Sequence, residues 1–160
     1  MISILIPIYN QSIVDLVQEF VAQCGKAKCQ FEIICLDDVS QPKFHDINRA
    51  VQHIMGVNYV ELTDHCGRSK IRNKLASLAR FEHLLFIDSD SKINSKRYIK
   101  KFLQAIEGPP EIIALGFSSM AWRNFLIYLL ELILLSESIN RRCSNRAKLA
   151  SLFLIFDRPQ

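Results

Sequence analysis

The sequence predicts an α/β fold with a mostly parallel sheet and helices on both faces. Short apolar runs alternate with segments of helical periodicity along residues 1–116. The runs are continuously apolar, which is typical of strands that are buried on both faces. Parallel strands of this kind are joined by right-handed crossovers through helices.

Each expected strand is a short apolar run bounded by polar or turn residues. In the first run, Pro7 has no N–H to donate to a ladder, so the regular part of that strand is predicted to end there. The second run leads directly into the acidic pair Asp37-Asp38. The five expected strands are Ser3–Ile8, Phe31–Leu36, Asn58–Leu62, 84–87 and Ile112–Leu115.

The first two helices are predicted from apolar residues at helical spacing. Ser12 is the expected N-cap of the first helix, with Asp15 as its capping-box partner, and Gly25 is the expected stop. Its apolar stripe is Ile13, Leu16, Val17, Phe20 and Val21. The second helix is expected to end near Gly56, and its stripe is Ile47, Ala50, Val51 and Ile54.

Two further helices follow the third and fourth strands. One opens at Cys66-Gly67, with the core positions Ile71, Leu75, Leu78 and Ala79 and the exposed basic positions Arg68, Lys70, Arg72 and Lys74. The other is capped by Ser95, ends at Gly108-Pro109-Pro110, and has the apolar stripe Ile99, Phe102, Leu103 and Ile106.

Composition narrows the class of protein. A chain of 160 residues with 49% hydrophobic and 22% charged residues suits one globular domain. Its net charge of +4 is mild, and there is no basic tract or row of aromatic residues, so no nucleic-acid partner is expected. Five cysteines without a Cys-x-x-Cys pair disfavour disulfides and zinc and indicate a reducing cytoplasm. The N-terminus has no basic leader, so no signal peptide is expected.

Acidic residues gather at the carboxyl ends of the expected strands, where ligands bind in sheets of this kind. Asp88 and Asp90 end the fourth strand, and side chains at i and i+2 of an extended chain point the same way, so both carboxylates can face one cation. A solvated acidic turn is the alternative explanation. The metal hypothesis is favoured because several polar residues share this edge, namely Tyr9, Asp37, Asp38, Asp88 and Asp90.

Two common phosphate-binding loops are missing from the sequence. Neither Gly-x-Gly-x-x-Gly nor Gly-x-x-x-x-Gly-Lys occurs. A nucleotide diphosphate at this edge would therefore need Mg²⁺ or Mn²⁺ held by carboxylates. Arg72 either adds positive charge at the diphosphate or lies on a solvated helix face. Asp38 either accepts a hydrogen bond from a base N–H or serves as a turn residue before Pro42.

Four segments in this order resemble family 2 glycosyltransferases of the GT-A (Rossmann-like) fold: 3–10 (SILIPIYN), 32–40 (EIICLDDVS), 67–73 (GRSKIRN) and 86–90 (FIDSD). The family transfers a sugar from a nucleotide diphosphate sugar to a saccharide or lipid-linked acceptor, usually with inversion. The resemblance implies that Pro7 and Tyr9 line the nucleotide pocket, Asp38 contacts the base and Arg72 lies near the diphosphate. It also implies that Asp88 and Asp90 form the Asp-x-Asp motif.

Further details follow from the same resemblance. Asp90 is expected to be the closest ligand of Mn²⁺ or Mg²⁺, with Asp88 beside it at the nucleotide sugar. The usual Asp-Asp-Gly-Ser of the family is Asp-Asp-Val-Ser here, and Val39 lacks the freedom of glycine at positive φ. The shape of this loop is therefore expected to differ from that of the family.

The resemblance covers residues 1–116 as a nucleotide-sugar-binding region and leaves 117–160 as a partial or divergent acceptor-side segment, helical or irregular. No catalytic base is assigned, because the acids after Asp90 form no pair; they are Glu107, Glu111, Glu131, Glu137 and Asp157. The acceptor half is thus expected to be incomplete. Phe125–Leu135 is shorter than the ~20 residues of a membrane helix and is expected in the core.

A basic segment after that run has two interpretations. Arg141, Arg142, Arg146 and Lys148 either cover a solvated helix face or contact anionic lipid headgroups. The second interpretation would place a cytoplasmic protein peripherally at the inner face of the membrane.

Three functional hypotheses follow. The first is a metal-dependent glycosyltransferase, and the second is a nucleotide-sugar-binding domain without transfer activity. The third is a receiver-type phosphorylation domain, which also clusters acids at strand ends. It is disfavoured because such a domain has its acidic pair after the first strand, where this chain has Tyr9-Asn10.

Overall fold

The computed structural model describes residues 1–106 of the chain. The expected fifth strand at Ile112–Leu115, the run Phe125–Leu135 and the basic segment behind it lie outside the described residues. Within residues 1–106, no helix is long and apolar enough to cross a lipid bilayer.

Four parallel strands form the sheet, in the order β3-β2-β1-β4. Their bounds are Ile2–Ile8 for β1, Phe31–Asp37 for β2, Val57–Glu61 for β3 and His83–Phe86 for β4. The chain adds β2 and β3 on one side of β1 and then returns to place β4 on the other side. This reversal creates a switch point between β1 and β4, where ligands bind in open α/β sheets.

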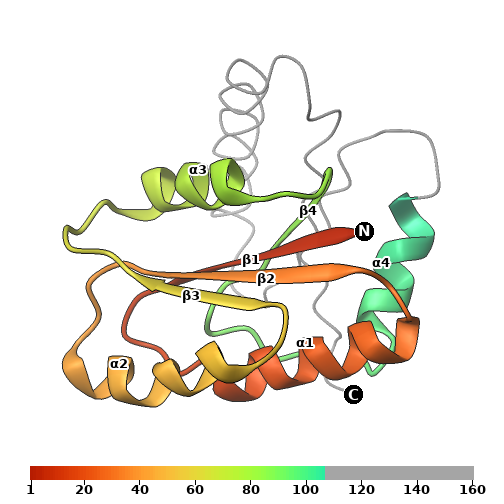
Figure 1. Cartoon of the computed structure of the whole chain (residues 1–160), viewed down its shortest axis with the longest axis horizontal. Coiled ribbons are helices and arrows are strands. Elements are labelled where there is room, and N and C mark those ends of the chain that lie inside the picture. The colour runs from red at the N-terminus through yellow and green to blue at the C-terminus, as the bar shows by residue number, and fades with distance from the viewer. Residues whose placement is uncertain (107–160) are drawn as a thin grey trace, which may run out of the picture.

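Helices cover both faces of the sheet, as expected for the α/β fold (Figure 1). The helix α3, Arg68–Leu78, covers one face, and α1, Val14–Ala27, lies on the other with α2, Pro42–Asn48, and the 3₁₀ helix η1, Arg49–His53. The last described helix, α4, Tyr98–Ile106, packs against α1.

The core follows the alternation of side chains along the strands. In β1, Ile4 and Ile6 enter the larger cluster with α1 and α4, whereas Leu5 enters the smaller cluster beneath α3. All three side chains are fully buried. This burial on both faces explains why the first strand reads as an unbroken apolar run rather than an alternating one.

The prediction that the first strand ends at Pro7 is wrong, because β1 continues to Ile8, which pairs with Asp37. In the β1 ladder, Ile2 and Ile8 bond toward β2, and Leu5 bonds toward β4. Pro7 shares the β4 side with Leu5, and the pairing of β4 with β1 stops at Leu5. The missing N–H therefore faces a place where no ladder partner is needed.

Both predicted ends of the first helix are also wrong. The N-cap is Ile13 and makes no side-chain cap; instead the buried Asn48 caps this end from α2, accepting from Ile13 N–H through Oδ1 at 3.0 Å. The helix continues through Gly25 to Ala27, and its C-cap Lys28 adopts a left-handed conformation with φ of 51°. A distant residue thus replaced the local capping box.

Two other expectations about helix faces need correction. Ile47 and Leu78 were expected in the core but are 47% and 48% exposed. Arg72 was expected on an exposed face but is only 7% exposed, and its solvated-face interpretation is wrong. The expected core positions Val51, Ile71 and Leu75 are buried, as are Ile99 and Phe102 of the last helix.

Candidate functional site

A pocket of about 420 Å³ lies at the carboxyl ends of β1, β2 and β4, beside the N-terminal half of α3. It includes every residue that the sequence assigned to a nucleotide site: Pro7, Tyr9, Asp38, Arg72, Asp88 and Asp90. These residues come from four separate segments of the chain. The fold therefore brings together what the sequence presented as isolated positions.

Backbone N–H groups hold the side chain of Asp38 in the wall of the pocket. Its Oδ1 accepts from Cys66 N–H at 2.7 Å, and its Oδ2 accepts from Gly67 N–H at 2.9 Å. Burial by itself would raise the pKa of Asp38, but these amide hydrogen bonds outweigh it and lower the pKa, so the carboxylate is ionised. Gly67 adopts φ of +77°, which lets the chain turn from β3 into α3 so that both amides reach Asp38.

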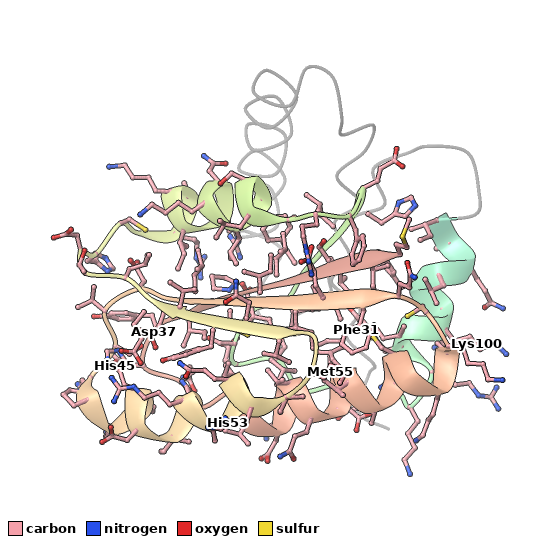
Figure 2. The ribbon with its side chains drawn as sticks, in the orientation of Figure 1. Phe31, Asp37, His45, His53, Met55 and Lys100 are labelled. Atoms are coloured by element: carbon pink, nitrogen blue, oxygen red, sulfur yellow. The ribbon has the colours of Figure 1, made fainter. Side chains whose placement is uncertain are left out.

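Asp37 does not join the pocket, although it was expected at the same edge. It is fully buried on the opposite face of the sheet, where Tyr59 O–H donates to its Oδ2 at 3.2 Å and His45 Nε2 lies 3.2 Å from its Oδ1. Figure 2 shows Asp37 and His45 pointing toward each other between the sheet and α2. Consecutive residues of an extended chain point to opposite faces, which separates Asp37 from Asp38.

The buried cluster around Asp37 orders the loop that carries Asp38. Burial, followed by the carboxylates of Asp37 and Glu61, raises the pKa of Tyr59, so its hydroxyl remains a donor. Asp37 Oδ1 also accepts from Ser40 N–H at 2.7 Å, and Ser40 Oγ in turn accepts from Asn10 N–H at 2.8 Å. These bonds join the loop after β2 to the loop after β1.

Val39 occupies a strained position within this loop. Its φ is +64°, in the left-handed region that a β-branched residue rarely adopts. The hydrogen bonds on either side hold the turn in place despite the valine. A loop shape different from that of the family stays a prediction.

Arg72 and Asp88 form an ion pair across the pocket. Arg72 Nη2 donates to Asp88 Oδ1 at 2.5 Å, and the Arg72 side chain is 8% exposed whereas that of Asp88 is 25% exposed. The pair joins α3 to the end of β4. A buried guanidinium needs a carboxylate or another anion as partner, so Arg72 is directed into the pocket rather than to solvent.

Asp90 differs from Asp88 in having no protein partner within residues 1–106. It is exposed at the rim of the pocket, in the turn where Ser91 N–H donates to Asp88 C=O at 3.0 Å. In the same residues no group of three or more His, Cys, Asp or Glu side chains is arranged to hold a metal by itself. Asp90 is therefore an available oxygen ligand, but the pocket is not a complete protein cage for a cation.

An aromatic pair forms another wall of the pocket. The rings of Tyr9 and His65 have centroids 5.5 Å apart and an interplanar angle of 54°. His65 was missed in the sequence, as were Gln11, Arg68 and Ser89, which also line the pocket. A signal was present, because His65 lies in the loop between β3 and α3, at the carboxyl edge where the other candidates were sought.

The chain is similar to known proteins over most of its length. A family model described as "Glycosyl transferase family 2" matches residues 3–155. A curated poly(ribitol-phosphate) beta-glucosyltransferase of Bacillus spizizenii is 33% identical over 116 residues, which are 69% of this chain and 18% of that protein.

Solved structures give the same fold. TarS of S. aureus, residues 1–349 in complex with UDP-GlcNAc, is 26% identical with a TM-score of 0.61, covering 75% of this chain and 36% of that chain. The mannosyltransferase PcManGT of Pyrobaculum calidifontis, in complex with GDP-Man and Mn²⁺, is 17% identical with a TM-score of 0.62, covering 80% and 38%. The chain thus spans between about a fifth and two fifths of the length of these proteins.

Proposed function

Because the chain belongs to glycosyl transferase family 2, we propose that it transfers a sugar from a nucleotide diphosphate sugar to a saccharide or lipid-linked acceptor. The transfer would depend on Mn²⁺ or Mg²⁺ and invert the anomeric centre. The family and the GT-A type of fold agree with the sequence-based expectation. The observation that carries the proposal is the convergence of six expected site residues on one pocket.

The pocket offers a different chemistry to each part of a donor. Tyr9 and Pro7 provide flat apolar surface for a base, and the ionised Asp38 lies on the same side. Arg72 supplies the positive charge that a diphosphate needs, in a guanidinium suited to bidentate contact with phosphate oxygens. Asp88 keeps this guanidinium directed into the pocket.

The residues present fit a hard divalent cation that is shared with the donor. Mg²⁺ is commonly bound through one or two carboxylates together with substrate phosphates, rather than in an all-protein cage. Asp90, with Asp88 beside it, matches this pattern, and Asp90 is the better ligand because Asp88 is already paired with Arg72. The cation would neutralise the diphosphate leaving group.

The proposal keeps the two regions of the chain that were predicted from the sequence. Residues 1–116 are the nucleotide-sugar-binding region, and 117–160 are the acceptor-side segment, in which no catalytic base is assigned. A cytoplasmic location with peripheral contact at the inner membrane face is part of the proposal. It is supported by the five cysteines, an odd number that disfavours a disulfide framework, and by the basic segment at 141–148.

A second candidate function is donor binding without transfer. It is favoured by one observation, namely that the acids after Asp90 form no pair from which a catalytic base could be assigned. A catalytic base must lie within hydrogen-bond reach of the acceptor hydroxyl, and a chain lacking one would bind the nucleotide sugar without turnover.

An assay of UDP release distinguishes sugar transfer from donor binding without transfer. The full chain would be incubated with UDP-GlcNAc or UDP-glucose, with a poly(ribitol phosphate) acceptor, in Mn²⁺ or in EDTA. Transfer predicts acceptor-dependent UDP release that falls at least about 100-fold in EDTA and in Asp90→Asn, because a cation that stabilises developing charge supplies several kcal/mol. Asp15→Asn, at an exposed site on α1, is the matched control and should not change the rate.

UDP binding without any release would instead support the second candidate. Release that is equally fast in EDTA would contradict the role of the metal. A chain that neither binds nor cleaves the donor in Mn²⁺ would contradict the proposed function itself.

A further inference from the structure

His65 has a polar atom that the fold leaves without a partner at the mouth of the pocket. Its Nδ1 lies 3.0 Å from Asp38 Oδ2 and 3.3 Å from the Asp38 carbonyl oxygen. Its Nε2 has no hydrogen-bond partner among residues 1–106, and its side chain is 61% exposed. The ring is thus anchored through one nitrogen and open at the other.

The surroundings of Nδ1 determine which nitrogen carries the hydrogen in the neutral ring. Both of its neighbours, a carbonyl oxygen and an ionised carboxylate oxygen, can only accept. Nδ1 must therefore be the donor, which leaves Nε2 of the neutral ring as an acceptor. Protonation of the imidazole would convert the same atom into a donor.

The carboxylate of Asp38 can accept few further hydrogen bonds from a ligand. A carboxylate accepts about four hydrogen bonds, and Asp38 already accepts from Cys66 N–H, Gly67 N–H and His65 Nδ1. Its side chain is only 5% exposed. Of Asp38 and His65, only His65 therefore offers a ligand an accessible acceptor, at Nε2.

We propose that His65 Nε2 accepts a hydrogen bond from the ring N–H of the donor's base, while Asp38 positions the imidazole. Such an acceptor selects bases with a ring N–H next to a carbonyl, as in uracil and guanine. It disfavours cytosine and adenine, whose corresponding ring nitrogen is itself an acceptor. The inference rests on the proposed function and makes His65 a specificity-determining residue of that site.

The proposal requires the neutral form of the His65 imidazole. The ionisable groups around His65 are Asp38 from the end of β2, Tyr9 from the end of β1, the adjacent Asp64 and Cys66, and Arg68 of α3 in the same pocket. In a protonated ring, Nε2 would face the base N–H donor to donor, so only the neutral ring can make the proposed hydrogen bond.

The test is calorimetric binding of UDP and of N3-methyl-UDP to the full chain in Mn²⁺ at about pH 8. Methylation replaces the base N–H with a methyl group. The two nucleotides carry the same diphosphate, so its metal binding cancels in their affinity ratio. The wild type should prefer UDP about tenfold.

Three variants make the test specific to the imidazole. His65→Phe keeps a ring against Tyr9 and should give a ratio near one. His65→Asn offers an amide oxygen as the acceptor and should keep the preference for UDP. His53→Asn, on η1 in the helical layer on the other face of the sheet (Figure 2), removes a histidine away from the pocket and should match the wild type.

Two results overturn the inference alone: a wild-type ratio near one, or a ratio in His65→Phe that equals that of the wild type. Failure of UDP to bind would overturn the proposed function together with the inference. The two failures are therefore distinguishable in the same experiment.

Discussion

Single residues at the ends of the strands decide which side chains reach the pocket. Asp37 and Asp38 are adjacent and chemically identical, yet Asp37 belongs to a buried cluster and Asp38 lines the pocket. The extended chain sends them to opposite faces. One residue later, Val39 makes the turn at φ of +64° without the freedom of glycine.

The strain at Val39 predicts that Val39→Gly stabilises the protein. A left-handed conformation costs a residue with a Cβ roughly 1–2 kcal/mol, of which part is offset by the greater chain entropy of glycine, so a net gain of about 1 kcal/mol is expected. Little packing is lost, since Val39 is 40% exposed. Urea unfolding of the full chain measures the change.

Val60→Gly is the matched control for this substitution. Val60 is 38% exposed on β3 and has no positive φ, so glycine there should destabilise the fold by about 1 kcal/mol. Destabilisation by Val39→Gly as well would show that the loop relies on the valine side chain and is not strained.

At the end of the sheet away from the pocket, the side chain of Glu32 links β2 to β1 and to the segment before β4. Its buried carboxylate on β2 accepts from Ser3 Oγ of β1 at 2.6 Å and from Arg80 N–H at 2.7 Å, just before β4. Burial alone would raise the pKa of Glu32, but the Ser3 hydroxyl and the N–H groups of Arg80 outweigh it and lower the pKa.

This arrangement predicts a pH-dependent contribution to stability. Because the pKa of Glu32 is lower in the folded chain than in the unfolded chain, its carboxylate stabilises the fold above the unfolded value of about 4.3. The contribution is lost as the pH falls through the folded value. Glu32→Gln should cost about 1–2 kcal/mol near pH 7, with a smaller difference from wild type below about pH 4.

The measurement is the free energy of unfolding of both proteins across this pH range. Glu82→Gln, at an exposed glutamate in the turn before β4, is the control and should follow the wild type throughout. A constant difference between wild type and Glu32→Gln at all pH values would contradict the role of the ionised carboxylate.

Elements and site residues were predictable from the sequence to different degrees. The four described strands and the burial of Ile71 and Leu75 follow from local apolar patterns. The ends of α1 do not, because Asn48, 35 residues from Ile13, replaces the expected local cap. The burial of Arg72 was also unpredictable, since it depends on an ion pair with Asp88 that forms only when α3 packs on the sheet.

For the whole molecule, the strand order determines where the site lies. The chain adds β2 and β3 on one side of β1 and β4 on the other, and this change of side creates a crevice at the carboxyl edge of the sheet. The pocket forms there without a glycine-rich loop. The positions of Pro7, Tyr9, Asp38, Arg72, Asp88 and Asp90 could be predicted because the four motifs occur in the order of the family. His65 belongs to no motif that was recognised, and its place in the loop after β3 was its only signal; its contacts with Asp38 and Tyr9 identify it in the structure.

The central claim is that a cation on Asp90 and Asp88 replaces the missing phosphate loop. Its most direct test is calorimetric binding of UDP to the full chain in Mn²⁺ and in EDTA, for the wild type, Asp90→Asn and the control Asp15→Asn. The account predicts that Mn²⁺ strengthens UDP binding at least about tenfold in the wild type and in Asp15→Asn, but not in Asp90→Asn. Equal affinity of the wild type for UDP with and without the metal would contradict it.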